Sequence, residues 1–195
     1  MAQQNHITHF TRAHDGDGAS AISMVFESIY TDLEHVARGL MRHERAGHTL
    51  GTSGVLHESY ERLLRTYGGD PRARSMDRDE LRAITARIMR RVLVDHARSR
   101  RARLNADAGH SACVARGAEE IAPMVVDLIA LDEALNELAA MDKEKASIVE
   151  LRFFGGMTMV KIAAMLGRPL RSVERDWAFA RAWLGMKVVG GVEDE

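Results

Sequence analysis

Apolar residues recur at steps of three and four along most of this 195-residue chain. That spacing places them on one side of an α-helix, whereas a half-buried strand would need every second residue to be apolar. No segment shows a convincing two-residue alternation, and no internal repeat is present. Only 5% of the residues are aromatic and only three are proline, which also favours helices over strands. The sequence therefore predicts an all-α protein.

Turn residues divide this helical pattern into segments. The first segment, Ala19 to Arg45, follows the sequence DGDG. Its apolar residues at helical spacing are Ile22, Val25, Phe26, Ile29, Leu33, Val36 and Leu40. The second, VLHESYERLLRTY, follows Thr52 and Ser53, either of which can cap a helix, and ends at GGDP. A third helix is predicted from about Asp79 to Arg101.

The periodicity is lost over residues 104–123, a small and polar stretch that we interpret as a linker. Four helical segments follow it: VVDLIALDEALNELAAM, DKEKASIVELRFFGG, MTMVKIAAML and LRSVERDWAFARAWLGMKV. The expected architecture is two helical domains, residues 1–103 and 124–195, joined by a flexible linker. The C-terminal domain is expected to be a four-helix helix-turn-helix.

Residues Thr158 to Lys187 have the form of a helix-turn-helix. Thr158 can cap a short first helix, Gly167 can adopt the left-handed conformation at its end, and Pro169 prevents it from continuing. A buried stripe is predicted on the second helix, made of Leu170, Val173, Trp177, Ala180 and Leu184.

The outward side of that second helix is a candidate DNA-reading surface. Near its N-terminal half it carries Arg171, Ser172, Glu174, Arg175 and Ala178. In a docked helix-turn-helix this part meets base edges in the major groove, where arginine can pair bidentately with guanine. An ordinary αα-hairpin with solvated charges is the alternative, because short motifs have a real false-positive rate.

Charge is distributed unevenly along a chain whose net charge is only −1. Residues 71–103 hold eleven arginines and four acids, whereas residues 104–150 hold ten acids and three basic residues. Arginine at this density favours a phosphate or base partner over a merely solvated helix face. The acidic stretch is in turn a candidate to cover a basic surface of the free protein.

The sequence indicates no catalytic, metal-binding or membrane-spanning site. The single cysteine, Cys113, excludes an intramolecular disulfide, and the pairs His6–His9 and His43–His48 lack the acids or thiols that would complete a metal site. No nucleophile–base set, glycine-rich phosphate loop or membrane-spanning apolar run is present. We expect no enzyme activity, no cofactor and no metal, and we expect a cytoplasmic protein without membrane contact.

Four stretches together resemble one branch of the extracytoplasmic-function (group IV) sigma factors, the small two-domain bacterial initiation factors of RNA polymerase. These stretches are RAGHTL…LHESYERLL, ARIMRRVLVDHARSRRAR, LDEALNELAAMDKEKASIVELRFFGGMTMVKIAAMLG and SVERDWAFARAWL. The resemblance runs in the family's order from about Ala19 to Lys187. It implies that the first domain binds core polymerase and the −10 promoter element, and that the second binds the −35 element.

The resemblance also implies roles for individual residues. Those matching the helix that docks on the β′ clamp helices are His57, Glu58, Tyr60, Glu61, Arg62 and Leu63. Those matching the segment that captures melted −10 DNA are Arg90, Arg91, Asp95, Arg98, Arg100 and Arg101. Those matching the −35 recognition helix are Arg171, Ser172, Glu174, Arg175 and Arg181.

The chain departs from the family pattern at three places. GTSGVLHES replaces a run that usually contains Gln-Pro-Thr, and GRPLRS lacks the usual Ser-Pro before the recognition helix. Glu174 stands where a lysine is common, which implies either an altered −35 preference or weaker binding. Core polymerase, through its β′ clamp helices and β flap, and promoter DNA are the implied partners, with an anti-sigma protein or a kinase as candidate regulators. A stand-alone helix-turn-helix regulator that binds an operator as a dimer, and a helical adaptor that binds only proteins, remain as alternatives.

Overall fold

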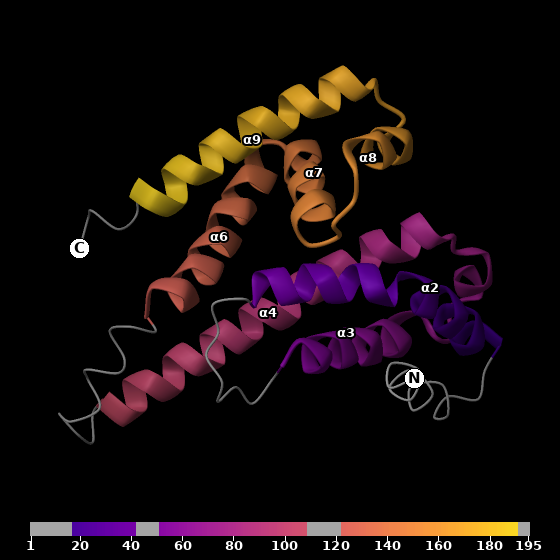
Figure 1. Ribbon diagram of the computed structural model, residues 1–195, viewed down its shortest axis with the longest axis horizontal. Coiled ribbons are helices and arrows are strands. Elements are labelled where there is room, and N and C mark those ends of the chain that lie inside the picture. The colour runs from indigo at the N-terminus through magenta and orange to yellow at the C-terminus, as the bar shows by residue number, and fades with distance from the viewer. Residues whose placement is uncertain (1–16, 42–50, 109–121, 191–195) are drawn as a thin grey trace. The chain divides into compact units, whose positions relative to one another are not determined.

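The structure is a computed structural model that describes residues 17–41, 51–108 and 122–190. These residues form seven α-helices, one short 3-10 helix and no strand (Figure 1). In chain order the elements are α2 (Asp17–Leu40), α3 (Thr52–Tyr67), η1 (Pro71–Ser75), α4 (Arg78–Ala108), α6 (Ala122–Met141), α7 (Lys143–Phe153), α8 (Met159–Leu166) and α9 (Leu170–Gly190). The prediction of an all-α protein is confirmed.

The chain divides into two compact units. The first takes the residues up to Met89 together with Phe153–Met157, and the second takes Arg90–Arg152 and the residues from Thr158 onward. The predicted domains, 1–103 and 124–195, stay a prediction. Of the predicted linker, residues 104–108 continue helix α4, whereas residues 109–121 lie outside the described part of the chain.

In the first unit, α2 packs against α3 and η1. Of the seven apolar residues expected on one side of α2, Ile22, Phe26, Ile29 and Leu33 are buried and the other three are half-buried. The rings of Phe26 and Tyr60 lie 4.8 Å apart, and the hydroxyl oxygens of Tyr60 and Ser23 share a hydrogen bond of 2.6 Å. Burial raises the pKa of Tyr60 above its ordinary value, so this phenol is a neutral part of the core.

The start of α3 differs from its prediction. Gly51 is the residue before the first helical turn, and no side chain caps that turn, so the expected capping by Thr52 or Ser53 is wrong. Thr52 is instead the first helical residue. The carbonyl of Gly51 accepts hydrogen bonds from the amides of Gly54 and Val55, so backbone groups alone begin this helix.

A buried arginine of the first unit holds the segment Phe153–Met157. The Nε of Arg82 donates to the carbonyl of Gly155 at 2.5 Å, and its Nη1 donates to Asp32 at 2.8 Å. Gly156 has a φ of 60°, and a Cβ at this residue would lie 2.6 Å from Cγ2 of Val36. Glycine at this position therefore permits both the left-handed backbone and the close approach to α2.

In the second unit, α6 and α8 both pack against α9. Figure 1 shows α8 beside the N-terminal end of the long helix α9. The core residues of α6, α7, α8 and α9 with 2% exposure or less are Leu135, Leu138, Ile148, Val149, Leu151, Ile162, Val173 and Ala180. This packing fixes the two helices of the predicted helix-turn-helix against the rest of the unit.

Candidate nucleic-acid interface

The turn between α8 and α9 is built from the residues that the sequence predicted. The Thr158 hydroxyl accepts a hydrogen bond of 3.3 Å from the amide of Lys161, which caps α8. Gly167 ends α8 with a φ of 62°, and the following amide, that of Arg168, donates back to Ala163 at 3.0 Å. The Pro169 carbonyl accepts the first backbone hydrogen bonds of α9. The local geometry of a helix-turn-helix is therefore present.

The buried side of α9 agrees with the prediction only in part. Val173, Ala180 and Leu184 are buried, and Trp177 is half-buried. Leu170 is 38% exposed, so its expected place in the buried stripe is wrong. Asp176 is 8% exposed, although the prediction left this carboxylate out of the buried side.

Arg168 compensates for the buried charge of Asp176. Its Nη2 donates to Asp176 Oδ2 at 2.6 Å, and its Nη1 donates to Glu144 Oε2 at 2.9 Å. The Arg168 side chain is 24% exposed and that of Asp176 is 11% exposed. The hydrogen bond to Asp176 raises the pKa of the Arg168 guanidinium. The Arg168 guanidinium, which comes from the segment between α8 and α9, thus links the start of α7 to the second turn of α9.

A second ion pair lies at the start of α7. Asp142 accepts a hydrogen bond of 3.0 Å from the amide of Lys145 and also pairs with the ammonium of Lys145. These bonds hold the pKa of Asp142 below its ordinary value and raise that of Lys145. The Lys145 ammonium lies 5.6 Å from the centre of the Phe179 ring of α9. The ion pair is local to the start of α7, whereas the contact with Phe179 joins α7 to α9.

The outer side of α9 carries the candidates for −35 recognition. Arg171, Glu174, Arg175 and Arg181 are exposed, and Ser172 is half-buried. Four of these candidates lie within the first two turns of α9, close to the segment that connects it to α8: Arg171, Ser172, Glu174 and Arg175. This end of the helix therefore offers two guanidinium groups and one carboxylate to a partner.

The arginines predicted for −10 DNA lie in the later part of α4, and they differ in their surroundings. Arg90 is only 8% exposed. Its Nη1 donates to Glu150 at 2.5 Å, its Nε donates to a carboxylate oxygen of Asp132 at 2.9 Å, and its Nη2 donates to the amide oxygen of Asn136 at 2.8 Å. Within the second unit this guanidinium is therefore engaged on every side by acceptors of α6 and α7.

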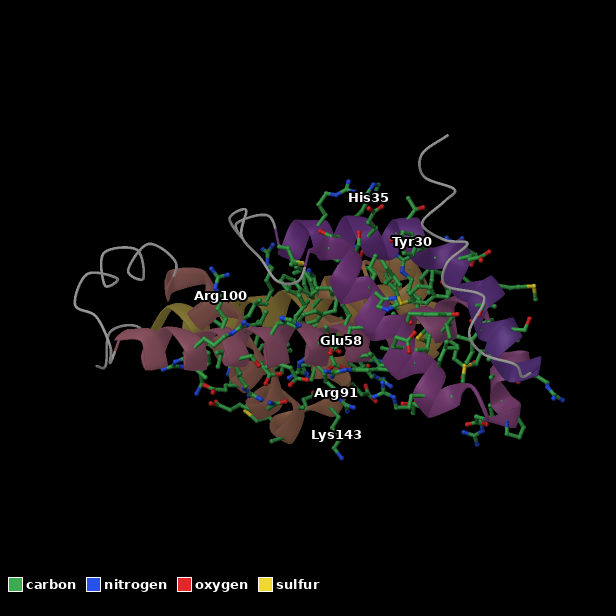
Figure 2. All side chains as sticks on the ribbon, turned by 90° about the horizontal axis from the view of Figure 1, so that it is seen from below. Tyr30, His35, Glu58, Arg91, Arg100 and Lys143 are labelled. Carbon is green, nitrogen blue, oxygen red and sulfur yellow. The ribbon has the colours of Figure 1, made fainter. Side chains whose placement is uncertain are left out.

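The other candidates on α4 are more accessible. Arg91, Asp95, Arg98 and Arg101 are exposed and Arg100 is half-buried; Figure 2 shows both Arg91 and Arg100 on this helix. The guanidinium of Arg98 pairs with Asp132 at 3.1 Å, and its side chain is still 54% exposed. The α4 candidates thus divide into one buried arginine and a set at the surface.

The predicted polymerase-binding residues divide in the same way along α3, the helix that carries Glu58 in Figure 2. Tyr60 and Leu63 are at most 2% exposed and belong to the core of the first unit. His57 is exposed, whereas Glu58, Glu61 and Arg62 are half-buried. Arg62 donates to Glu58 one turn away at 2.6 Å. The accessible part of this candidate surface is therefore charged, and its aromatic and aliphatic members hold the helix from beneath.

The described residues provide neither a metal site nor a membrane-spanning helix. No group of three or more His, Cys, Asp or Glu side chains in ranges 17–41, 51–108 and 122–190 could hold a metal ion. Cys113 and the four histidines of the pairs His6–His9 and His43–His48 lie outside the described residues. In that same part of the chain no helix is both long and apolar enough to cross a membrane.

Comparison with known proteins identifies the family. A family model described as ECF sigma factor matches residues 4–189, which include α3, the arginines of α4 and the whole helix-turn-helix. No curated protein and no solved structure matches the chain closely enough to be counted as similar. The family match confirms the resemblance drawn from the sequence. Because a single family model covers nearly all of its length, this chain belongs to the ECF sigma factor family, whose members act in transcription initiation.

Proposed function

We propose that this protein is the promoter-specificity subunit of a bacterial RNA polymerase, which it joins in the cytoplasm. It binds the core enzyme, contacts the −10 and −35 promoter elements, and leaves the chemistry of RNA synthesis to the polymerase. The observation that carries this proposal is a helix-turn-helix with Arg171 and Arg175 exposed on its second helix, in a chain matched by the sigma factor family over residues 4–189.

The −35 element is read by α9. Arg171 and Arg175 are one helical turn apart, so both can enter one major groove and pair with guanine edges. Ser172 can donate to a base or a phosphate. Glu174 rejects phosphate but can accept from the amino group of cytosine, so its place in the first two turns should give this chain its own −35 preference. Arg181 lies two turns further on and is assigned to the phosphate backbone.

The −10 element is contacted by the later part of α4. Each arginine that neutralises a phosphate contributes roughly 0.9 to the salt slope of binding to duplex DNA and roughly 0.7 on a single strand. Arg98, Arg100 and Arg101 are assigned to this role, whereas Arg91 and Asp95 are assigned to the bases. Arg90 can join them only when its guanidinium leaves Asp132 and Glu150, because its donors are occupied by these groups.

Core polymerase is bound through α3. The β′ clamp helices are assigned the polar and charged residues His57, Glu58, Glu61 and Arg62, and the β flap is assigned the second domain. Anchoring on polymerase removes the need for a dimer, since the second contact raises the effective concentration of each DNA-binding part. Regulation by an anti-sigma protein or a kinase is part of the proposal for these same surfaces.

Reconstitution with core polymerase tests the proposal. The full chain is mixed with bacterial core enzyme on a genomic promoter library, and start sites are mapped by run-off transcription. Specific start sites with shared −10 and −35 sequences are expected. Arg171→Ala and Arg175→Ala should abolish or redirect them, whereas Arg38→Ala, which removes a 61% exposed arginine from α2, should not.

The outcomes separate the alternatives. A stand-alone regulator would bind a specific operator as a dimer without polymerase and would give no start sites of its own. A protein adaptor would tolerate Arg171→Ala and Arg175→Ala in every DNA-linked assay. Either result contradicts the proposed function.

A further inference from the structure

The N-terminal end of the recognition helix α9 has few apolar contacts of its own. Leu170, its first residue, is 38% exposed, and Met165 in the preceding helix α8 is also 38% exposed. Val173 is the first residue of α9 that is fully buried. Val173 is therefore the one buried apolar side chain in the first turn of α9.

An ion pair lies on the buried side of α9, at a residue that the predicted stripe did not include. Asp176 lies three residues after Val173 and four before Ala180, so it is on the buried side of α9. Its carboxylate meets Arg168 at 2.6 Å, and Arg168 reaches Glu144 of α7 at 2.9 Å with its other terminal nitrogen. The Pro169 carbonyl, one residue after Arg168, accepts hydrogen bonds from the amides of Ser172 and Val173, so α9 begins directly after the residue that carries the guanidinium.

Such a pair is directional in a way that apolar contact is not. A guanidinium is planar, and its two terminal nitrogens point to fixed positions about the plane. With one nitrogen on α7 and the other on α9, the guanidinium limits both rotation and tilt of α9 relative to α7. The residues assigned to base contact, Arg171 to Arg175, lie between the Arg168 turn and Asp176. Any change of orientation here therefore moves them directly.

Base readout is sensitive to that movement. A bidentate contact from arginine to guanine needs two hydrogen bonds of normal length at once, and these bonds weaken steeply when the donor angle or distance changes. A small rotation of α9 would shift Arg171 and Arg175 to a neighbouring base or to the phosphates. Orientation of the helix is thus part of its specificity.

We propose that Arg168 and Asp176, with Glu144, are positioning residues for −35 recognition: they touch no DNA and set the base preference of α9 by fixing its orientation on α7. This inference rests on the proposed function. It assigns a specificity role to a residue of the turn and to a buried carboxylate, neither of which is on the DNA-facing side of α9.

The test measures sequence preference separately from total affinity. The full chain, bound to core polymerase, is presented with promoter duplexes randomised in the −35 element, and bound sequences are counted. Arg168→Gln, Asp176→Asn and their combination are compared with wild type. Lys187→Gln is the matched control, because it removes a cation of the same helix that pairs with Glu137 at 2.7 Å far from the turn.

Both single variants are expected to lose discrimination at the −35 bases by about 5-fold or more, the equivalent of weakening one good base contact. The combined variant should be no worse than either single one, because both remove the same interaction. Lys187→Gln should keep the wild-type preference. Urea unfolding of each variant is measured alongside.

A purely structural role gives a different pattern. Loss of folded protein lowers binding to all −35 sequences in proportion and leaves their ranking unchanged, and that result would overturn the proposal. If Arg168→Gln does not fold, Asp176→Asn decides, since it keeps the size of the side chain and one acceptor. A wild-type preference retained by Asp176→Asn then counts against the positioning role. Absence of any −35 preference in the wild-type complex would instead refute the proposed function itself.

Discussion

Replacing Arg90 by methionine should destabilise the second unit, whereas the same change at its neighbour Arg91 should not. Methionine keeps an unbranched stem of similar length and removes the charge and all donors. The Arg90 side chain is 10% exposed, and its carboxylate partners on Asp132 and Glu150 are 13% and 17% exposed. Arg91 lies on the exposed side of the same helix turn.

The size of the effect follows from what is left behind. Arg90 makes contacts of 2.7 Å with Asp132 and 2.5 Å with Glu150. Removal of one partner of a fully buried ion pair costs about 3–5 kcal/mol, because the other charge stays desolvated. Both carboxylates have some access to water, and Asp132 keeps Arg98 at 3.1 Å, so we expect about 2–3 kcal/mol for Arg90→Met, below the fully buried range. An exposed substitution such as Arg91→Met should stay within about 0.5 kcal/mol.

Tryptophan fluorescence during urea unfolding provides the assay. The two tryptophans of the chain, Trp177 and Trp183, both lie in α9, so their emission reports on the same unit that holds Arg90. With a urea slope of roughly 2 kcal/mol per molar, the midpoint of Arg90→Met should fall by about 1 M. Adding Asp132→Asn to Arg90→Met should recover part of the loss, because it removes one of the unpaired charges.

Equal midpoints for Arg90→Met and Arg91→Met would refute this reasoning. They would mean that Asp132 and Glu150 do not hold the Arg90 guanidinium in solution. A further drop in the urea midpoint when Asp132→Asn is added to Arg90→Met would also contradict the reasoning. It would mean that the Asp132 carboxylate stabilises the fold even without Arg90.

Three other changes have expected outcomes that are simple to measure. Gly156→Ala and Gly167→Ala both place an alanine at a φ near 60°, and this left-handed backbone should lower the free energy of unfolding by about 1–2 kcal/mol in each variant. Only at Gly156 does the new Cβ also overlap a neighbouring side chain, that of Val36. Circular dichroism during urea unfolding should therefore find Gly156→Ala the more destabilised of the two, and equal losses would argue against the close packing at Gly156. The pKa of Asp142 in the folded protein is lowered chiefly by the side-chain hydrogen bond from Lys145. The ionised carboxylate therefore stabilises the fold fully above the ordinary pKa of 3.8, and this contribution is lost as the pH falls through the lower folded pKa. The stability difference between wild type and Asp142→Asn should hence be constant near neutral pH and shrink below about pH 4, and a difference independent of pH would show that the charge of Asp142 contributes nothing.

The sequence by itself determined the local structure of this protein. Helical spacing of apolar residues gave the all-α class, and it identified Ile22, Phe26, Ile29 and Leu33 as a buried face. The cap of Thr158 and the left-handed Gly167 were also readable, because each depends on the backbone preferences of a few adjacent residues. The family resemblance likewise rested on contiguous motifs, and the match over residues 4–189 confirmed it.

A signal for the burial of Asp176 is present in the sequence, but the predicted buried stripe does not include this residue. Its spacing from Val173 and Ala180 puts it on the buried side of α9, yet an unpaired carboxylate is not expected there. Only a cation close by in space resolves that conflict, and Arg168 supplies it from the turn. The helical spacing correctly places Asp176 on the buried side, but an aspartate is not a residue type expected in a core.

The tertiary structure alone decided which polar side chains are buried. Arg90 and Arg91 are neighbours in an arginine-rich segment and look alike in the sequence, yet Arg90 is 8% exposed and Arg91 is exposed. The carboxylates that offset the cost of burying the Arg90 charge belong to Asp132 and Glu150, which are 42 and 60 residues away in the sequence. A helical pattern specifies which residues share a side of a helix, but the free energy of burying a charge depends on partners that only the folded chain brings within hydrogen-bond distance.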